Sequence, residues 1–167
     1  MFSRYTYPSV KNLFEKFTLL VVFLLIFVQF SKGQERIVQK PCFDSVLQKQ
    51  ADSLKDFLTQ RGFIVAREAT MTMQSQYEMP VIVPLTEGTW YQFVFLGDKD
   101  SKLYEVRMYD WGEKQVVYKK NGIENNLIMF PYIPKQTTYF MIKPVQVSNI
   151  KKKKELCGYL IIFKKVK

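Results

Sequence analysis

The chain has 167 residues, no histidine, two cysteines, and 25 Lys and Arg against 15 Asp and Glu, which is a formal net charge of +10. This length suits one compact domain, and the lack of histidine excludes Ser-His-Asp and Cys-His catalysis and every histidine-containing metal site. Aromatic residues make up 16% of the chain, which favours a strand-rich fold over disorder. We therefore expect a non-enzymatic protein without a cofactor. An enzyme would have to work with carboxylates such as Asp98, Asp100 or Asp110.

The first 33 residues have the organisation of a secretory signal peptide. A basic start is followed by residues 17–30, which carry no charge. Ser31 and Gly33 then place small residues at the −3 and −1 positions of a cleavage site before Gln34. We therefore predict a signal peptide over residues 1–33 and export to the periplasm, the cell surface or the extracellular space. The alternative is an uncleaved signal anchor in residues 17–30, although a membrane-spanning helix needs about 20 apolar residues.

Export determines how the two cysteines are interpreted. Cys42 and Cys157 lie near opposite ends of the exported part of the chain, and a pair of thiols outside the cytosol is expected to form a disulfide. A reactive redox pair is the alternative, but neither cysteine belongs to a Cys-x-x-Cys motif. We therefore predict a structural disulfide between Cys42 and Cys157.

Residues 34–62 are predicted to form an N-terminal segment with one amphipathic helix. After Cys42 the apolar residues recur at spacings of three and four, which is the period of a helix with one apolar face. These residues are Phe43, Val46, Leu47, Ala51, Leu54, Phe57 and Leu58. Gly62 follows as a helix stop. We expect the apolar face to cover an end or a face of a sheet.

From residue 63 to residue 167 the apolar period changes to two, which indicates a domain of β-strands. Short runs rich in Val, Ile, Tyr, Phe and Thr alternate with turn residues. The expected strands are Phe63–Arg67, Met71–Gln76, Met79–Leu85, Thr89–Leu96, Leu103–Tyr109, Gln115–Lys119, Leu127–Phe130, Thr138–Lys143 and Tyr159–Lys164. So many short strands in one segment predict a β-sandwich or a β-barrel.

Three of these strands carry information about their place in a sheet. In Met79–Leu85, Pro80 and Pro84 cannot donate a backbone hydrogen bond, so we expect an edge strand or a strand that crosses between sheets. Residues 159–163 are apolar on both faces, which is typical of a covered central strand. The alternation in Thr89–Leu96 predicts one buried face and one solvated face.

A series of segments follows from Val81 onward in a recognisable order. They are Val81–Leu85, Gly88–Tyr91 with Phe93, Leu103–Asp110 with Gly112, Leu127–Phe130, Thr138–Ile142 and Gly158–Leu160. This order resembles the bacterial pre-peptidase C-terminal domain over roughly residues 77–164. The resemblance implies a secreted, non-catalytic accessory module. We therefore expect a mainly β protein, a jelly-roll-like antiparallel β-sandwich of about eight or nine strands preceded by one amphipathic α-helix.

Aromatic residues are the first candidates for a binding site. Trp111 lies at an expected turn, and Trp90 lies on the less buried face of its strand. Exposed aromatic rings present a flat apolar surface on which sugars or peptides stack, whereas buried rings fill cores. Trp90 and Trp111 are therefore candidates for a ligand platform, with packing in the core or at its rim as the alternative.

Charged residues supply two further candidates. An anion-binding patch is predicted from Lys151, Lys152, Lys153, Lys154, Lys164 and Lys165, with a solvated loop that blocks edge pairing as the alternative. No aromatic residue interrupts the lysine run, which argues against nucleic acid binding. Asp98 and Asp100 are a weak calcium candidate, because calcium needs six to eight ligands. A solvated hairpin turn is the alternative for these two residues, and we expect no other metal site.

Together these features predict an exported, non-catalytic binding or structural module of the cell envelope or the extracellular space. The expected partner is an envelope polymer, a glycan or a protein, and membrane contact is expected only through residues 17–30 if they stay uncleaved. One alternative is a membrane-tethered accessory subunit that recruits a protein partner. A second alternative is a glycan-binding module that uses exposed aromatic rings.

Overall fold

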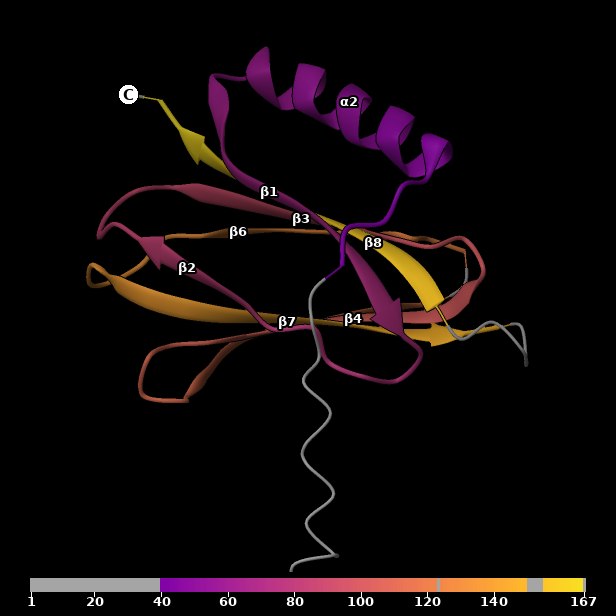
Figure 1. The fold of residues 1–167 in the computed structure, drawn as a ribbon. Helices are drawn as coiled ribbons and strands as arrows, with labels where there is room; N and C mark the ends of the chain where they lie inside the picture. Colours follow the sequence, from indigo (N-terminus) through magenta and orange to yellow (C-terminus); the bar gives the residue numbers. More distant parts are fainter. Residues whose placement is uncertain (1–39, 123, 150–154, 167) are drawn as a thin grey trace, which may run out of the picture. The chain divides into compact units, whose positions relative to one another are not determined.

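The computed structural model of the chain describes residues 40–122, 124–149 and 155–166. The predicted signal peptide and the lysines at positions 151–154 lie outside these described residues. Within them the chain forms one helix followed by eight strands (Figure 1). The elements are α2 (Ser45–Thr59), β1 (Phe63–Gln74), β2 (Val81–Leu85), β3 (Tyr91–Gly97), β4 (Ser101–Tyr109), β5 (Gln115–Gly122), β6 (Leu127–Tyr132), β7 (Thr138–Ser148) and β8 (Glu155–Lys165).

The strands form two antiparallel sheets of four strands each, with the orders β1-β8-β3-β6 and β2-β7-β4-β5. Of the strands that follow each other directly in the chain, only β4 and β5 are paired in one sheet. The chain otherwise alternates between the two sheets and places its first strand beside its last, which is the topology of a jelly roll. The predicted fold class is confirmed.

The strand predictions are confirmed with one change in number. The runs predicted at Phe63–Arg67 and Met71–Gln76 belong to a single strand, β1, whose register against β8 shifts between Val65 and Arg67. β2, which contains Pro84, is an edge strand, and β8 lies between β1 and β3. Both positions agree with the predictions from proline and from apolar content.

The main core lies between the two sheets and consists of alternate residues of the strands. Its buried members include Met71, Met73, Val83, Phe93, Phe95, Tyr104, Val106, Met108, Phe130, Phe140, Ile142, Leu160 and Ile162. The rings of Phe93 and Phe130 stack with centroids 5.1 Å apart. The side chains that alternate with these residues must therefore point to the two outer faces of the sandwich.

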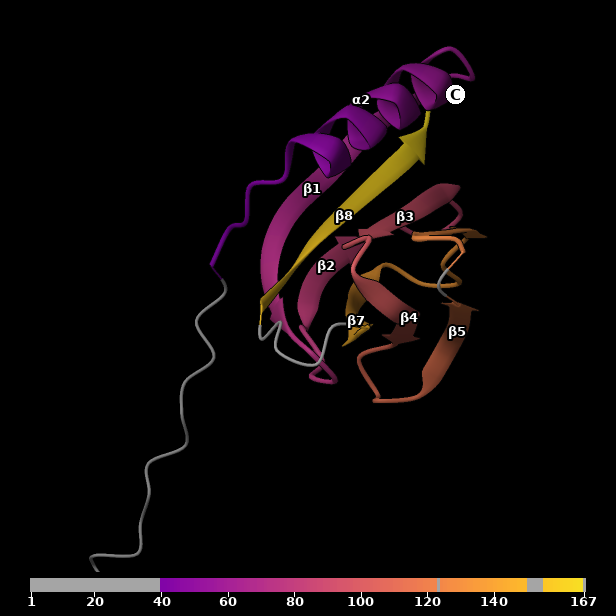
Figure 2. The same cartoon turned by 90° about the vertical axis from the view of Figure 1, so that its right-hand side faces the viewer.

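Helix α2 covers the outer face of the β1-β8-β3-β6 sheet (Figure 2). It starts where the carboxylate of Asp44 accepts hydrogen bonds from the backbone N–H groups of Val46 and Leu47, at 2.8 and 3.0 Å. It ends before Gly62, whose φ of 74° favours glycine. The second core beneath the helix consists of Leu47, Ala51, Leu58, Phe63, Val94, Leu96, Tyr159, Ile161 and Phe163.

Two sequence predictions were wrong about this covered face. The alternation in β3 predicted one solvated face, but Val94 and Leu96 are buried under α2, so both faces of β3 are dry. The predicted apolar face of the helix was too wide, because Phe43, Val46 and Phe57 are exposed. Phe43 precedes the first helical residue, Ser45, and Val46 and Phe57 flank the buried stripe of Leu47, Ala51 and Leu58.

Candidate binding face

The outer face of the β2-β7-β4-β5 sheet is the candidate site. Helix α2 packs on the opposite sheet, and alternation with the core turns a set of aromatic, apolar and charged side chains to this outer face. We call its aromatic and apolar part the aromatic face; its residues are Ile82, Tyr109, Trp111, Tyr118, Tyr139 and Met141. Register aligns several of them in rows, since Met141 of β7 lies opposite both Ile82 of β2 and Tyr109 of β4.

Trp111 and Tyr139 form the most exposed part of the aromatic face. Trp111 lies in the turn between β4 and β5, which Asp110 closes by accepting a hydrogen bond from the backbone N–H of Lys114 at 2.9 Å. Trp111 is 65% exposed and Tyr139 is 53% exposed. Their ring centroids are 5.7 Å apart with an interplanar angle of 51°. Two adjacent rings thus offer an open aromatic surface to a ligand.

A row of ion pairs continues the same face beyond the aromatic rings. The Arg107 guanidinium lies 2.8 Å from a carboxylate oxygen of Glu78 and 2.8 Å from one of Glu105. The hydrogen bond with Glu105 is the main cause that raises the pKa of Arg107. The Lys143 ammonium lies 3.0 Å from Glu78 and 5.0 Å from the centroid of the Tyr109 ring. Hydrogen-bond donors and acceptors therefore stand side by side next to the aromatic surface.

The structure separates the two tryptophans that the sequence grouped as one platform. Trp90 precedes β3 in the other sheet, where it packs edge-on against Phe63 with centroids 5.6 Å apart. Trp111 instead pairs with Tyr139, which was not among the predicted site residues. The sequence contains a pattern that indicates this position: Tyr139 alternates with the apolar residues Phe140 and Ile142 in one strand, so it lies on the face opposite to theirs.

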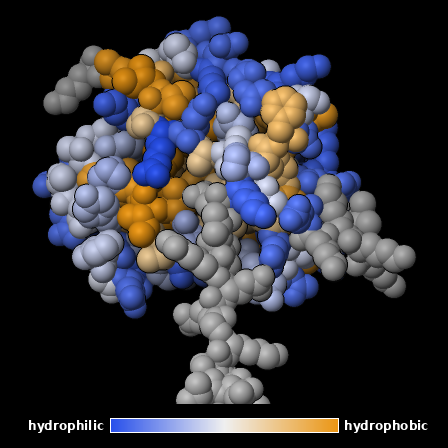
Figure 3. Space-filling view, in the orientation of Figure 1, coloured by the Kyte–Doolittle hydropathy of each residue, from blue (hydrophilic) through white to orange (hydrophobic). Residues whose placement is uncertain are grey.

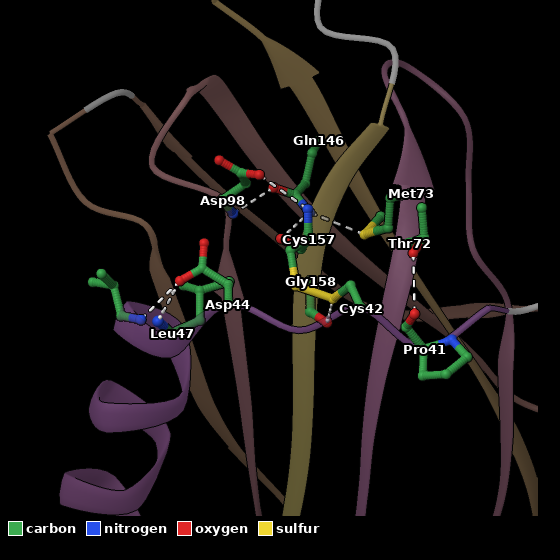
Figure 4. The surroundings of a disulfide bond; sticks show 11 residues. Pro41, Cys42, Asp44, Leu47, Thr72, Met73, Asp98, Gln146, Cys157 and Gly158 are labelled. Atoms are coloured by element: carbon green, nitrogen blue, oxygen red, sulfur yellow. Dashed lines mark hydrogen bonds between the residues drawn. A yellow bond between two sulfur atoms is a disulfide. The ribbon is translucent and has the colours of Figure 1, made fainter.

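The predicted disulfide is confirmed between Cys42, which precedes α2, and Cys157 in β8, with their Cα atoms 5.6 Å apart (Figure 4). Beside it, Asp98 is only 5% exposed. Its carboxylate accepts hydrogen bonds from the backbone N–H groups of Cys157 and Asp100, both at 3.0 Å. The prediction of a solvated hairpin turn was therefore wrong for Asp98. The turn connects β3 and β4, which belong to different sheets. Within it Asp98 is buried, Asp100 is half-buried and Lys99 is exposed.

Gln146 of β7 completes a buried polar cluster around this turn (Figure 4). Its side-chain oxygen accepts hydrogen bonds from the backbone N–H of Asp98 at 2.7 Å and from the Ser101 hydroxyl at 3.1 Å. Its amide donates to the carbonyl of Cys157 at 3.1 Å. The buried Tyr104 hydroxyl donates to the carbonyl of Asp98 at 2.9 Å. Burial, followed by the negative charge of Asp98, raises the pKa of Tyr104. This cluster ties the turn to β7 and β8.

The remaining predicted residues do not gather into one site. Asp110 lies at the opposite end of β4 from the turn with Asp98 and Asp100. Across the described ranges, no three His, Cys, Asp or Glu side chains lie together as a metal site would require. Lys164 and Lys165 end β8. No helix of the described residues is both long and apolar enough to cross a bilayer.

No family model and no curated protein matches the sequence. The Gap123 glycosylation-associated protein complex from Streptococcus agalactiae is 14% identical with a TM-score of 0.31, over 62% of this chain and 39% of that chain. The VP2 subviral particle of infectious bursal disease virus is 15% identical with a TM-score of 0.35, over 60% and 32%. Drosophila melanogaster CENP-C bound to CAL1 is 10% identical with a TM-score of 0.31, over 72% and 96%.

The chain thus spans 39% and 32% of the first two of these structures. None of the three is a pre-peptidase C-terminal domain, and that resemblance stays a prediction.

Proposed function

We propose that the protein is an exported, non-catalytic binding module that holds a saccharide chain on the aromatic face. The observation that carries this proposal is the pairing of Trp111 with Tyr139, both of them more than half exposed on the sheet that α2 leaves uncovered. Leaving two large rings in water forgoes the stability that their burial would contribute. Contiguous apolar surface of this kind is typical of a binding site.

The charged row beside the rings favours a neutral polyhydroxylated ligand. Arg107 and Lys143 are already paired with Glu78 and Glu105, so a simple anion would compete with carboxylates that are held in place. A sugar hydroxyl both donates and accepts, and it is able to bridge the two partners of an ion pair without displacing either. The apolar face of a pyranose ring at the same time packs on an aromatic side chain. Saccharides therefore match both parts of the surface.

Trp111→Ala is expected to weaken saccharide binding by about tenfold or more, as for a central aromatic residue of an interface. Tyr139→Ala removes the other ring of the pair and is expected to have the same direction of effect. The measurement is retardation of the exported protein in gels that contain soluble cell-wall and extracellular polysaccharides. Each positive polysaccharide is then titrated against the protein by calorimetry.

Trp90→Ala is the matched control, because it removes an exposed tryptophan from the other sheet and leaves the aromatic face intact. It is expected to keep the wild-type affinity, and circular dichroism establishes that all three variants are folded. The proposal is wrong if the wild-type protein is retarded by none of the polysaccharides, or if Trp90→Ala and Trp111→Ala lose affinity equally.

Export is supported by the disulfide, which is expected in an oxidising compartment. We expect N-terminal sequencing of the exported protein to begin at Gln34, because Ser31 and Gly33 precede it with the small residues that a signal peptidase requires. A sequence that begins at Met1 would instead favour the membrane-tethered accessory subunit, in which residues 17–30 remain in the bilayer.

A further inference from the structure

A second exposed surface lies where α2 ends and β8 stops, on the opposite sheet from the aromatic face. Phe63 of β1 lies opposite Lys165 of β8, and the backbone N–H of Lys165 donates to the carbonyl of Trp90 at 2.8 Å. The Lys165 ammonium lies 5.0 Å from the centroid of the Phe63 ring, and it also donates to the backbone carbonyl of Arg61. Residues distant in sequence are therefore joined into one surface.

We call this surface the Trp90 patch. Its apolar residues are Phe57, Val65, Trp90 and Val166, and its cations are Arg61 and Lys165. Lys164 alternates with Lys165 in β8 and lies opposite Tyr91 on the other side of the sheet, so it is not part of this patch. Trp90 is 45% exposed although its ring packs against Phe63, and Val166 is 49% exposed. The space-filling view shows apolar side chains among hydrophilic ones at the end of the molecule where the C-terminus lies (Figure 3).

No carboxylate of the described residues forms an ion pair with a cation of the Trp90 patch. The ion pairs among the residues that the structure describes involve Lys55, Arg107, Lys120 and Lys143, and none involves Arg61 or Lys165. The Arg61 guanidinium instead lies 3.4 Å from the centroid of the Phe57 ring. The patch therefore presents uncompensated positive charge directly beside exposed apolar side chains.

We propose that the Trp90 patch docks the protein on an anionic phospholipid bilayer. Phosphate headgroups complement Arg61 and Lys165, and the exposed rings and aliphatic side chains enter the boundary between headgroups and acyl chains. Tryptophan suits this boundary because its ring is apolar and its N–H is polar. A soluble anionic polymer would satisfy the cations but leave Trp90 and Val166 in water. The sequence predicted membrane contact through residues 17–30 only.

The test follows the fluorescence of Trp90 itself. The chain has two tryptophans, so Trp111→Phe leaves Trp90 as the only source of tryptophan fluorescence. The variant is prepared from Gln34 onward, because that chain retains the disulfide and every residue of both cores. Vesicles of phosphatidylglycerol and phosphatidylcholine are expected to shift its emission to the blue, and brominated acyl chains are expected to quench it. Vesicles of phosphatidylcholine alone are expected to leave the emission unchanged.

Charge variants distinguish binding through the Trp90 patch from the general attraction of a basic protein to anionic vesicles. Adding Arg61→Gln and Lys165→Gln is expected to lower the vesicle partition coefficient by about 30-fold at low salt. Adding Lys102→Gln and Lys119→Gln, which removes the same charge from exposed positions on β4 and β5, is expected to change it little.

The proposal is overturned if Trp90 emission neither shifts nor is quenched, if the patch pair and the control pair of charge variants have equal effects, or if dextran sulfate shifts the emission as strongly as vesicles do. The last result would identify the patch as a contact for soluble polyanions. These readouts do not depend on the aromatic face, so the bilayer proposal and the saccharide proposal succeed or fail separately.

Discussion

Replacing both Cys42 and Cys157 with serine is expected to lower the free energy of unfolding by about 4 to 5 kcal/mol. The disulfide closes a loop over a sequence separation of 115 residues, and the entropy that such a crosslink removes from the unfolded chain corresponds to about 4.7 kcal/mol for 100 residues. Native domains have only about 5–15 kcal/mol of stability in total, so this one bond supplies a large share. The measurement is guanidinium chloride unfolding of the wild-type protein and the double variant.

The control for this prediction is chemical reduction. Wild-type protein treated with dithiothreitol is expected to approach the stability of the double variant, and the double variant is expected to be insensitive to the reductant. The denaturant slope should rise in both cases, because an unfolded chain without the crosslink exposes more surface. A loss below about 1 kcal/mol would contradict the chain-entropy explanation.

Gly97→Ala is expected to destabilise the fold by about 2 to 3 kcal/mol, at the upper end of the range for overpacking a core. A Cβ at this position would lie 2.3 Å from the Tyr104 ring and 2.9 Å from the Gln146 side-chain oxygen. Tyr104 is fully buried and Gln146 is held by several hydrogen bonds, so neither side chain is free to move away. Thermal and denaturant unfolding measure the loss.

Gly122→Ala is the matched control, because an added Cβ there meets no atom within 4 Å. It is expected to change stability by less than about 0.5 kcal/mol, as for an ordinary surface position. In a Tyr104→Leu background Gly97→Ala is expected to cost less than in the wild type, since the smaller side chain relieves the closest contact. Equal losses of stability for the two glycine variants would show that the loss comes from replacing any glycine in a strand and not from the contact with the buried Tyr104 ring.

Local patterns in the sequence predicted the helix, the strands and the disulfide. The apolar period located the helix and eight strands, proline marked β2 as an edge, and the pair of cysteines predicted the disulfide. Each of these signals lies within a few residues of the feature that it predicts, or depends on there being only one other partner. These features are therefore predictable without knowledge of the tertiary structure.

Relations between distant strands were the part that local patterns could not predict. Whether Val94 faces solvent depends on where α2 docks, and alternation within β3 contains no information about that. Trp90 and Trp111 share one residue type but lie on different sheets, because the chain changes sheet between β3 and β4. The partner of Trp111 is Tyr139 in β7, and that contact follows from the jelly-roll strand order alone. The same holds for Gln146, which reaches Asp98 from another strand.

The pairing of β1 with β8 has a consequence for how the protein reaches its final form. Under the proposed export, a chain that crosses the membrane N-terminus first delivers β1 and Cys42 to the oxidising side well before β8 and Cys157. Neither the sheet under α2 nor the covalent link is complete until the last strand has emerged, and such non-local pairing is slow to form. Because the chain has no third cysteine, the Cys42 thiol cannot form an incorrect disulfide within its own chain before Cys157 emerges. Premature crosslinks are then confined to encounters between molecules, and their frequency should rise with the rate of synthesis.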